Sequence, residues 1–342
     1  MKVNKIVCIG GYGHSVTVLD DMVGMKNVSL VACAPAYKGE KIDNVKNHKI
    51  FNFRVQIFNE YKEMLNTIKP DITIISTRLD KIPAVTIDAA KAKSHLIVEK
   101  PLALDFKTLS LVNKTIKENR VKLMAMLTMR SLPAFIAARK IYKRGDIGEV
   151  VIINARKSYK WGHDRPKWFG VRSMYGGTIP WVGIHALDFI NYITGLEFTK
   201  VAAMHSNYAH SSHKRCEDNC ALIYELSNGG HATVSVDFCR PMSASTHGDD
   251  WIRIVGTKGV IEANASKEFC EVIKENQLPK KVKLPKNEKI FKNFLTSLAG
   301  KSDYHVPEKE SFMLTNASLC GRQAADCKKV LQINKNFGYK VI

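Results

Sequence analysis

The sequence predicts an α/β fold of two domains, the first of which is a doubly wound parallel sheet. Strand-like apolar runs alternate with helix-like runs as far as residue 121, and β-rich runs are frequent after it. The chain has 342 residues, and a single hydrophobic core seldom grows beyond about 250 residues. We therefore expect two domains, spanning residues 1–121 and 122–342.

The first domain is predicted from a series of βαβ units. Strand-like runs lie at residues 5–9, 29–33, 72–76 and 95–98, and the stretch 85–92 has helical periodicity. Such alternation is typical of parallel sheets that are covered by helices on both faces and bind ligands at the carboxyl ends of the strands.

A glycine-rich turn follows the first strand-like run and has the sequence Gly10-Gly11-Tyr12-Gly13-His14-Ser15. In this place, backbone N–H groups can approach a pyrophosphate at the start of a helix. Gly11 and Gly13 match the first two glycines of the dinucleotide fingerprint, whereas the third position falls on Val16 or Ser15. The turn indicates a Rossmann domain that binds a dinucleotide; a plain tight turn is the alternative.

The end of the second strand bears on the choice of cofactor. Domains that prefer NAD carry an Asp or Glu there, which binds the adenosine ribose hydroxyls. This chain has Ala34 instead, and Lys38 and Lys41 follow. We expect NAD or NADP as cofactor with a preference for NADP, whose 2′-phosphate the lysines would accommodate, unless they are only surface residues.

Four motifs in the same order along the chain carry a resemblance to a known family. They are Glu99-Lys100-Pro101, Arg130-Ser131-Leu132-Pro133, the stretch 145–150, and Gly176-Gly177 followed by Gly183-Ile184-His185-Ala186-Leu187-Asp188. With them the chain resembles the glucose-fructose oxidoreductase, inositol dehydrogenase and rhizopine catabolism (Gfo/Idh/MocA) family. The motifs span most of the chain.

The resemblance implies a second α/β domain with an open, mostly antiparallel sheet. One face of this sheet would bind substrate and the other would form a subunit interface, so we expect a homo-oligomer, either a dimer or a tetramer. The β-rich runs that support this prediction lie at residues 150–157, 200–206, 220–226, 231–238 and 251–255. Residues 226–231 predict a hairpin turn, and residues 130–144 and 308–330 predict helices.

For function, the resemblance implies an NAD(P)-dependent oxidoreductase that transfers a hydride between nicotinamide and a hydroxyl or carbonyl of a sugar, polyol or sugar acid. Lys100 and His185 are the expected catalytic pair, because such a reaction needs groups that move the hydroxyl proton and stabilise the oxyanion. The alternatives are a surface lysine after a strand, and a buried histidine satisfied by Asp188. The expected cofactor-binding residues are Gly10, Gly11, Tyr12, Gly13, His14, Ser15, Ala34, Lys38, Ser76, Thr77, Glu99 and Lys100.

A donor-rich and aromatic segment after residue 157 is the expected substrate loop, because aromatic faces bind sugar C–H surfaces while cationic groups hold polar substituents. A solvated loop with packed tryptophans is the alternative. The expected substrate-binding residues are Lys100, Tyr159, Lys160, Trp161, His163, Arg165, Trp181 and His185.

One position departs from the family pattern. Many sugar dehydrogenases of the family carry Asp four residues before the histidine, where this chain has Trp181. Tryptophan can stack on a sugar ring but cannot accept a proton. A non-catalytic sensor or regulator that binds a dinucleotide or a sugar is therefore the second hypothesis.

Composition excludes several other classes of protein. The net charge of +20 favours anionic ligands, but no nucleic-acid module appears and we expect no nucleic-acid partner. No apolar run reaches the roughly 18 residues of a membrane span, and the first residues show neither the hydrophobic region nor the cleavage site of a signal peptide, so we expect a cytoplasmic protein. The eight cysteines lack CxxC spacing; His213, Cys216 and Cys220 resemble half of a zinc site without a second half, and we expect no metal.

Overall fold

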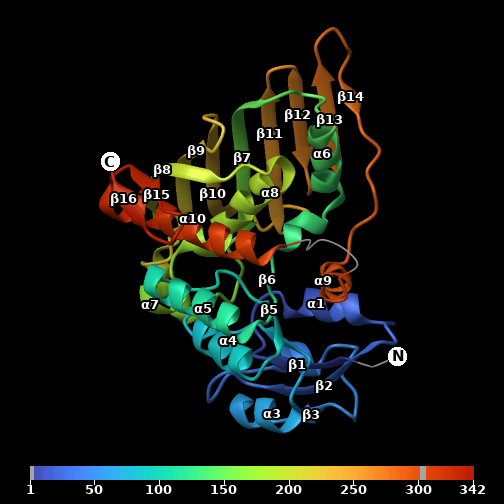
Figure 1. Ribbon diagram of the computed structural model, residues 1–342. Coiled ribbons are helices and arrows are strands. Elements are labelled where there is room, and N and C mark those ends of the chain that lie inside the picture. Colours follow the sequence, from blue (N-terminus) through green and yellow to red (C-terminus); the bar gives the residue numbers. More distant parts are fainter. Residues whose placement is uncertain (1–3, 301–305) are drawn as a thin grey trace. The chain divides into compact units, whose positions relative to one another are not determined.

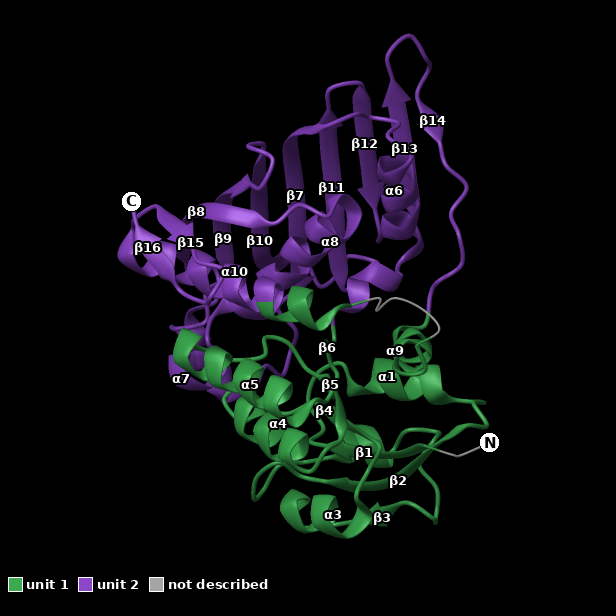
Figure 2. Ribbon diagram, in the orientation of Figure 1, with its two compact units in different colours: residues 1–126, 289–312 green, residues 127–288, 313–342 purple. Residues whose placement is uncertain are grey.

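The computed structural model describes residues 4–300 and 306–342, and its chain divides into two compact units (Figure 2). Unit 1 comprises Met1–Met126 and Lys289–Phe312, and unit 2 comprises Leu127–Glu288 and Met313–Ile342. The predicted boundary after residue 121 lies close to the first of these crossings. The return of the chain to unit 1 at Lys289 was not predicted.

The described part of unit 1 contains a parallel sheet of six strands in the order β3-β2-β1-β4-β5-β6. Its strands are β1 (Asn4–Ile9), β2 (Val28–Ala34), β3 (Gln56–Ile57), β4 (Ile72–Ile75), β5 (His95–Val98) and β6 (Leu123–Ala125). The strand order reverses between β1 and β4, and a crevice for ligands forms at such a reversal. The Rossmann-type prediction is confirmed.

Helices cover this sheet, and Figure 1 shows the pair α4–α5 and the pair α1–α9 on opposite sides of the strands. The helices of unit 1 are α1 (Ser15–Met22), α2 (Asp43–Lys46), α3 (Tyr61–Ile68), α4 (Ile82–Lys91), α5 (Phe106–Asn119) and α9 (Ile290–Leu298). The backbone N–H of Phe291 donates to the Asp21 carboxylate at 3.1 Å, which joins α9 to the end of α1. This contact explains why α9 belongs to unit 1.

Unit 2 is built on a ten-stranded sheet within the residues that the structure describes, in the order β14-β13-β12-β11-β7-β10-β9-β8-β15-β16. The strands are β7 (Val150–Lys160), β8 (Phe198–Ser206), β9 (Asn219–Leu226), β10 (His231–Arg240), β11 (Gly248–Gly256), β12 (Gly259–Asn264), β13 (Phe269–Lys274), β14 (Lys280–Lys281), β15 (Leu331–Ile333) and β16 (Tyr339–Val341). Strands β7 and β10 pair in parallel and the other pairs are antiparallel. The predicted mostly antiparallel sheet is confirmed.

One face of this sheet is covered by helices α6 and α8 (Figure 1). The helical segments described in unit 2 are η1 (Thr128–Ser131), α6 (Pro133–Lys143), η2 (Lys167–Gly170), α7 (Arg172–Tyr175), the π-helix η3 (Ile179–Gly183), α8 (Ile184–Thr194), η4 (Ser211–His213) and α10 (Glu308–Cys327), which begins in unit 1. On the other face, Met204 of β8 and Ile223 of β9 are 79% and 54% exposed. Alternate residues of a strand point to opposite faces, so Met204 and Ile223 form an exposed apolar patch on this second face.

Candidate active site

The glycine turn lies where the sequence predicts it, between β1 and α1, and its glycines are sterically required. Gly10 and Gly13 have φ angles of +83° and +102°, which L side chains rarely adopt. A Cβ atom on Gly10 would lie 2.5 Å from the carbonyl oxygen of Ser76, and one on Gly13 would lie 2.1 Å from Glu99 Oε2. The turn therefore packs directly against the segments that follow β4 and β5.

Glu99 fixes the start of α1. Its carboxylate is fully buried and accepts the His14 backbone N–H at 2.6 Å, and His14 Nδ1 lies 2.9 Å from the same oxygen. Burial raises the pKa of Glu99, but His14 and Lys100 favour the charged form more strongly, so the pKa lies below its usual range. Glu99 is thus a carboxylate that ties the glycine turn to the end of β5.

The turn also fits a pyrophosphate. The first N–H groups of a helix have no partner within that helix and attract an anion. Ser15, at the first turn of α1, is fully buried, and its hydroxyl has no hydrogen-bond partner among the described residues. An oxygen-rich anion at the start of α1 would satisfy these donors, so the residues present fit the phosphates of a dinucleotide.

Lys100 follows Glu99 at the same edge of the sheet. It is 1% exposed, and its backbone N–H donates to Glu99 Oε1 at 3.0 Å. Ser76, after β4, donates its hydroxyl to the Tyr12 carbonyl oxygen at 2.5 Å. Unit 1 therefore brings together the predicted residues of the glycine turn, of the segment after β4 and of the Glu-Lys-Pro motif.

The loop that follows β2 contains a functional candidate, Glu40, that the sequence did not reveal. Ala34 is buried there, and Lys38 and Lys41 are exposed. Glu40, however, accepts the Ala36 backbone N–H at 2.6 Å and the Thr77 hydroxyl at 2.5 Å. A carboxylate therefore lies at this edge after all, supplied by the loop that follows the strand.

In unit 2, His185 lies in the first turn of α8, directly after the π-helix η3 that contains Trp181. His185 is fully buried and Trp181 is 8% exposed. π-Helical turns are rare in proteins as a whole, and those that occur often lie at functional sites. Both predicted residues are thus held by packed helical structure.

An ion pair holds α8 in place. Arg130 Nε lies 2.5 Å from Asp188 Oδ1, and both side chains are buried. Arg130 also donates to Asn191 Oδ1 at 3.4 Å. Because His185 lies one turn before Asp188, this pair fixes the helix that carries the predicted catalytic histidine.

The expected substrate loop separates into two groups. Arg165 stacks on the rings of Trp161 and Phe238, at 4.3 and 4.0 Å from the ring centroids, and donates to the Trp161 carbonyl oxygen at 2.6 Å. Lys160 donates to the Ala244 carbonyl oxygen at 2.5 Å, and His163 is exposed. Much of the hydrogen-bonding and stacking capacity of this loop is therefore used within unit 2.

The predicted residue Tyr159 lies in the second group. The sequence did not reveal its partners in this group. The buried Lys157 ammonium lies 2.6 Å from Asp250 Oδ1 and 4.1 Å from the centre of the Tyr159 ring. The ring of His247 lies 4.6 Å from that of Tyr159. These four residues contribute to the lining of a cavity of about 290 Å³.

The charges in this cavity are set by burial together with the neighbouring charged and polar groups. Burial lowers the pKa of Lys157, but Tyr159 and Asp250 raise it more, so the ammonium stays charged. Burial, followed by the charge of Lys157, lowers the pKa of His247 below 6.5. The cavity therefore offers a cation, a carboxylate and a neutral imidazole, a set suited to hydroxyl-rich ligands.

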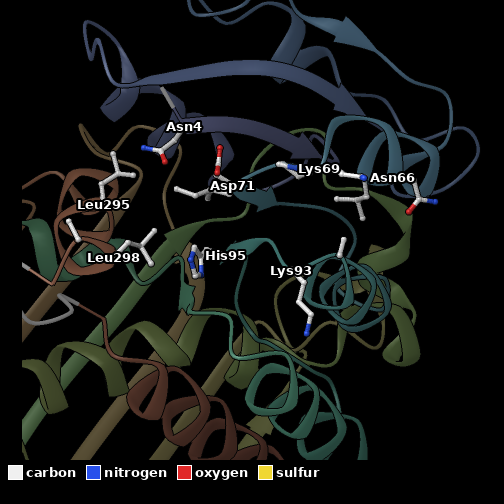
Figure 3. A pocket seen from close by; sticks show the side chains of 13 residues that line it. Asn4, Asn66, Lys69, Asp71, Lys93, His95, Leu295 and Leu298 are labelled. Carbon is white, nitrogen blue, oxygen red and sulfur yellow. The ribbon is translucent and has the colours of Figure 1, made fainter. Parts of the chain in front are cut away.

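A larger cavity in unit 1, of about 800 Å³, lies at the opposite edge of the parallel sheet (Figure 3). Asn4 and His95, which line it, are the first residues of β1 and β5. Ligands of open α/β sheets bind at the carboxyl ends of the strands, so this cavity is not the cofactor site.

Across residues 4–300 and 306–342, no group of three or more His, Cys, Asp or Glu side chains could hold a metal ion. In the same ranges, no helix has the length and apolar character that crossing a membrane requires.

Comparisons with known proteins agree with this geometry. Residues 39–127 match the model of an oxidoreductase family with an NAD-binding Rossmann fold, and residues 135–262 match the GFO/IDH/MocA C-terminal domain. A solved structure from Thermotoga maritima, described as an oxidoreductase, is 34% identical, with a TM-score of 0.91 over 96% of this chain and 100% of that one.

Two further relatives are named for sugar chemistry. Levoglucosan dehydrogenase in complex with NADH has a TM-score of 0.83 over 97% of this chain and 100% of that one; at 17% identity this likeness shows the fold alone. The 2,7-anhydro-N-acetylneuraminate hydratase of Escherichia coli is 30% identical over 197 residues, which are 56% of this chain and 51% of that protein. The match thus spans about half the length of this curated relative.

Proposed function

The chain belongs to the GFO/IDH/MocA oxidoreductase family, and from this we propose that it transfers a hydride between a nicotinamide dinucleotide and a hydroxyl or carbonyl carbon of a sugar, polyol or sugar acid. The observation that carries the proposal is Glu99, which binds the start of α1 while its neighbour Lys100 is buried at the same strand end. This arrangement connects a pyrophosphate-binding turn with a residue able to act on a proton.

The dinucleotide would be held by the turn from Gly10 to Ser15 and by the segment after β4 that includes Ser76. NADH in the solved complex of levoglucosan dehydrogenase supports this cofactor class. When bound, the nicotinamide supplies the carbon that accepts or donates the hydride. The residues of the turn hold and orient the phosphates through backbone N–H groups and the Ser15 hydroxyl.

Lys100 and His185 would handle the proton of the reacting hydroxyl. A buried amine or imidazole can hydrogen-bond to a hydroxyl and take its proton as a carbonyl forms. Lys100 belongs to unit 1 and His185 to unit 2, so each must be tested separately and then together.

The substrate class follows from the side chains of unit 2 and from the names of the relatives. Lys157, Asp250 and His247 border one cavity with the face of Tyr159, and such a mixture of charges, a polar ring and an aromatic face suits a polyhydroxylated ring. Levoglucosan and an anhydro-sugar acid are the compounds in the names of the two relatives. We therefore favour a cyclic sugar or sugar acid as substrate.

Trp181 gives a reason to keep a second candidate function, a sensor that binds the same ligands without turnover. It occupies a buried position directly before α8 and cannot accept a proton. In that case the protein would bind dinucleotide and sugar, but no change in nicotinamide absorbance would follow.

The proposal is tested by turnover over a panel of sugars, polyols and sugar acids, measured by absorbance of reduced nicotinamide. We expect Lys100→Met and His185→Ala each to lower kcat by about 10²- to 10⁴-fold, with nearly unchanged affinity for the dinucleotide. Lys91→Met and His231→Ala, at exposed positions, are the matched controls. Turnover that survives both test substitutions would contradict the catalytic roles, and absence of turnover together with binding would support the sensor.

A further inference from the structure

We propose that Glu40 binds the adenosine ribose of the cofactor and makes the protein select NAD over NADP. This inference rests on the proposed function, since it assigns a residue to the cofactor that the function requires. It also opposes the preference for NADP that Lys38 and Lys41 suggest in the sequence.

The first step is the position of the Glu40 carboxylate. Ala36 lies just beyond β2 and Thr77 just beyond β4, and Glu40 accepts hydrogen bonds from both. Strand β1 lies between β2 and β4 in the sheet. The carboxylate therefore lies over the carboxyl end of β1, where the glycine turn begins and where the strand order reverses.

The second step is the anchoring of the loop that carries Glu40. The Asn44 side chain donates to the Gly11 carbonyl oxygen at 2.9 Å. A Cβ atom on Gly11 would lie 2.7 Å from both Ile42 Cα and the Lys41 carbonyl oxygen. The loop is packed against the glycine turn, so Glu40 has a defined place relative to the pyrophosphate site.

The third step is the capacity of the carboxylate for further hydrogen bonds. Two carboxylate oxygens offer about four acceptor positions, and Ala36 and Thr77 use one on each oxygen. Glu40 is only partly buried. The remaining positions suit the vicinal hydroxyls of a ribose, which is the role of the Asp or Glu that usually ends the second strand.

The fourth step is the balance of charge at this place. An arginine near the ribose usually accommodates the 2′-phosphate of NADP. Arg78 is the nearest candidate, but it makes two hydrogen bonds to Asp80, at 2.5 and 2.9 Å, and stacks on Tyr37. Lys38 and Lys41 are exposed and their charges are screened by water and salt. A 2′-phosphate would therefore meet the negative charge of Glu40 without an uncommitted arginine.

The test is titration of the full chain with NADH and NADPH, followed by nicotinamide fluorescence at constant ionic strength. We expect the Kd for NADPH to exceed that for NADH at least tenfold. Glu40→Gln should reduce this ratio about tenfold, equivalent to about 1.4 kcal/mol, because the amide neither repels a phosphate nor accepts two hydroxyls. Asp43→Asn removes a charge from an exposed position of the same loop and should leave the ratio unchanged.

A second measurement needs no variant and covers the case in which Glu40→Gln does not fold. The wild-type chain should bind 2′-deoxy-NAD about tenfold more weakly than NAD, because one ribose hydroxyl is missing. Equal binding of these two, an unchanged ratio in Glu40→Gln, or tighter binding of NADPH than of NADH would overturn the role of Glu40 alone. Binding of neither dinucleotide would overturn the proposed function and this inference together.

Discussion

Removal of the Arg130 guanidinium should destabilise unit 2 more than any change to an exposed ion pair. Arg130 and Asp188 are both buried, 2.5 Å apart between Nε and Oδ1. Arg130→Met leaves the Asp188 carboxylate in the interior without this partner. Breaking a buried pair from one side typically costs about 3–5 kcal/mol, because the remaining charge cannot be solvated.

The expected shift in melting temperature follows from the size of the unit. For domains of about 150–250 residues, each 1 kcal/mol lowers the melting temperature by about 2–4 °C. Arg130→Met should therefore lower the transition of unit 2 by about 6–20 °C. Arg144→Met is the matched control, because Arg144 is 60% exposed and pairs with Asp146 at the surface; we expect a change below about 1 kcal/mol.

Differential scanning calorimetry measures both transitions, and a double variant separates charge from packing. Arg130→Met combined with Asp188→Asn should be less destabilised than the sum of the single variants by about 1 kcal/mol or more, since the two groups interact directly. A loss in Arg130→Met no greater than in Arg144→Met, or strict additivity in the double variant, would refute the reasoning. Loss of turnover should accompany the loss of stability, because the pair holds the helix of His185.

Two further predictions concern unit 2. Burial, and then the charge of Lys157, lower the pKa of His247. The stability that neutral His247 contributes is therefore fully present above pH 6.5 and is lost as the pH falls through the folded-state pKa. NMR should show the His247 ring titrating below pH 6.5, and His247→Gln should reduce the loss of stability in acid. The exposed apolar patch of Met204 and Ile223 should form part of an interface between copies of the chain. Ile223→Lys should therefore shift the mass measured by light scattering from a dimer or tetramer towards the monomer, whereas Leu111→Lys, at another exposed apolar position, should not. A monomeric wild type would contradict the interface.

The sequence predicted those parts of the fold that depend on local pattern. Short, largely apolar runs located β1, β2, β4 and β5, because strands that are buried on both faces consist mainly of apolar residues. The strand Phe269–Lys274 was missed, since the charged residues Glu271 and Lys274 interrupt the apolar pattern of a short segment. The assignment of α9 to unit 1 depends on a contact with Asp21, far away in the chain, which no local pattern encodes.

The candidate site divides in the same way. Glu99 and Lys100 were predictable because a motif directly after a buried strand must lie at the carboxyl edge of the sheet. Lys157, His247 and Asp250 were not, because strand register brings β7 next to β11. Asp250 pairs with Lys157 across these two strands. The residues next to either one in the sequence give no sign of this pairing.

The two carboxylates of unit 1 explain why net charge is a poor guide to cofactor choice. The chain carries a formal charge of +20, which favours any anion, yet the nearest charges decide which anion fits. Glu99 is balanced by His14 and Lys100, so its negative charge does not oppose a pyrophosphate at the start of α1. Glu40 is held by a backbone N–H and a hydroxyl, which are neutral donors, and the cation that acts on it, Arg78, pairs with Asp80. We therefore expect this edge of the sheet to accept the two phosphates that NAD and NADP share and to resist the third phosphate that NADP alone carries.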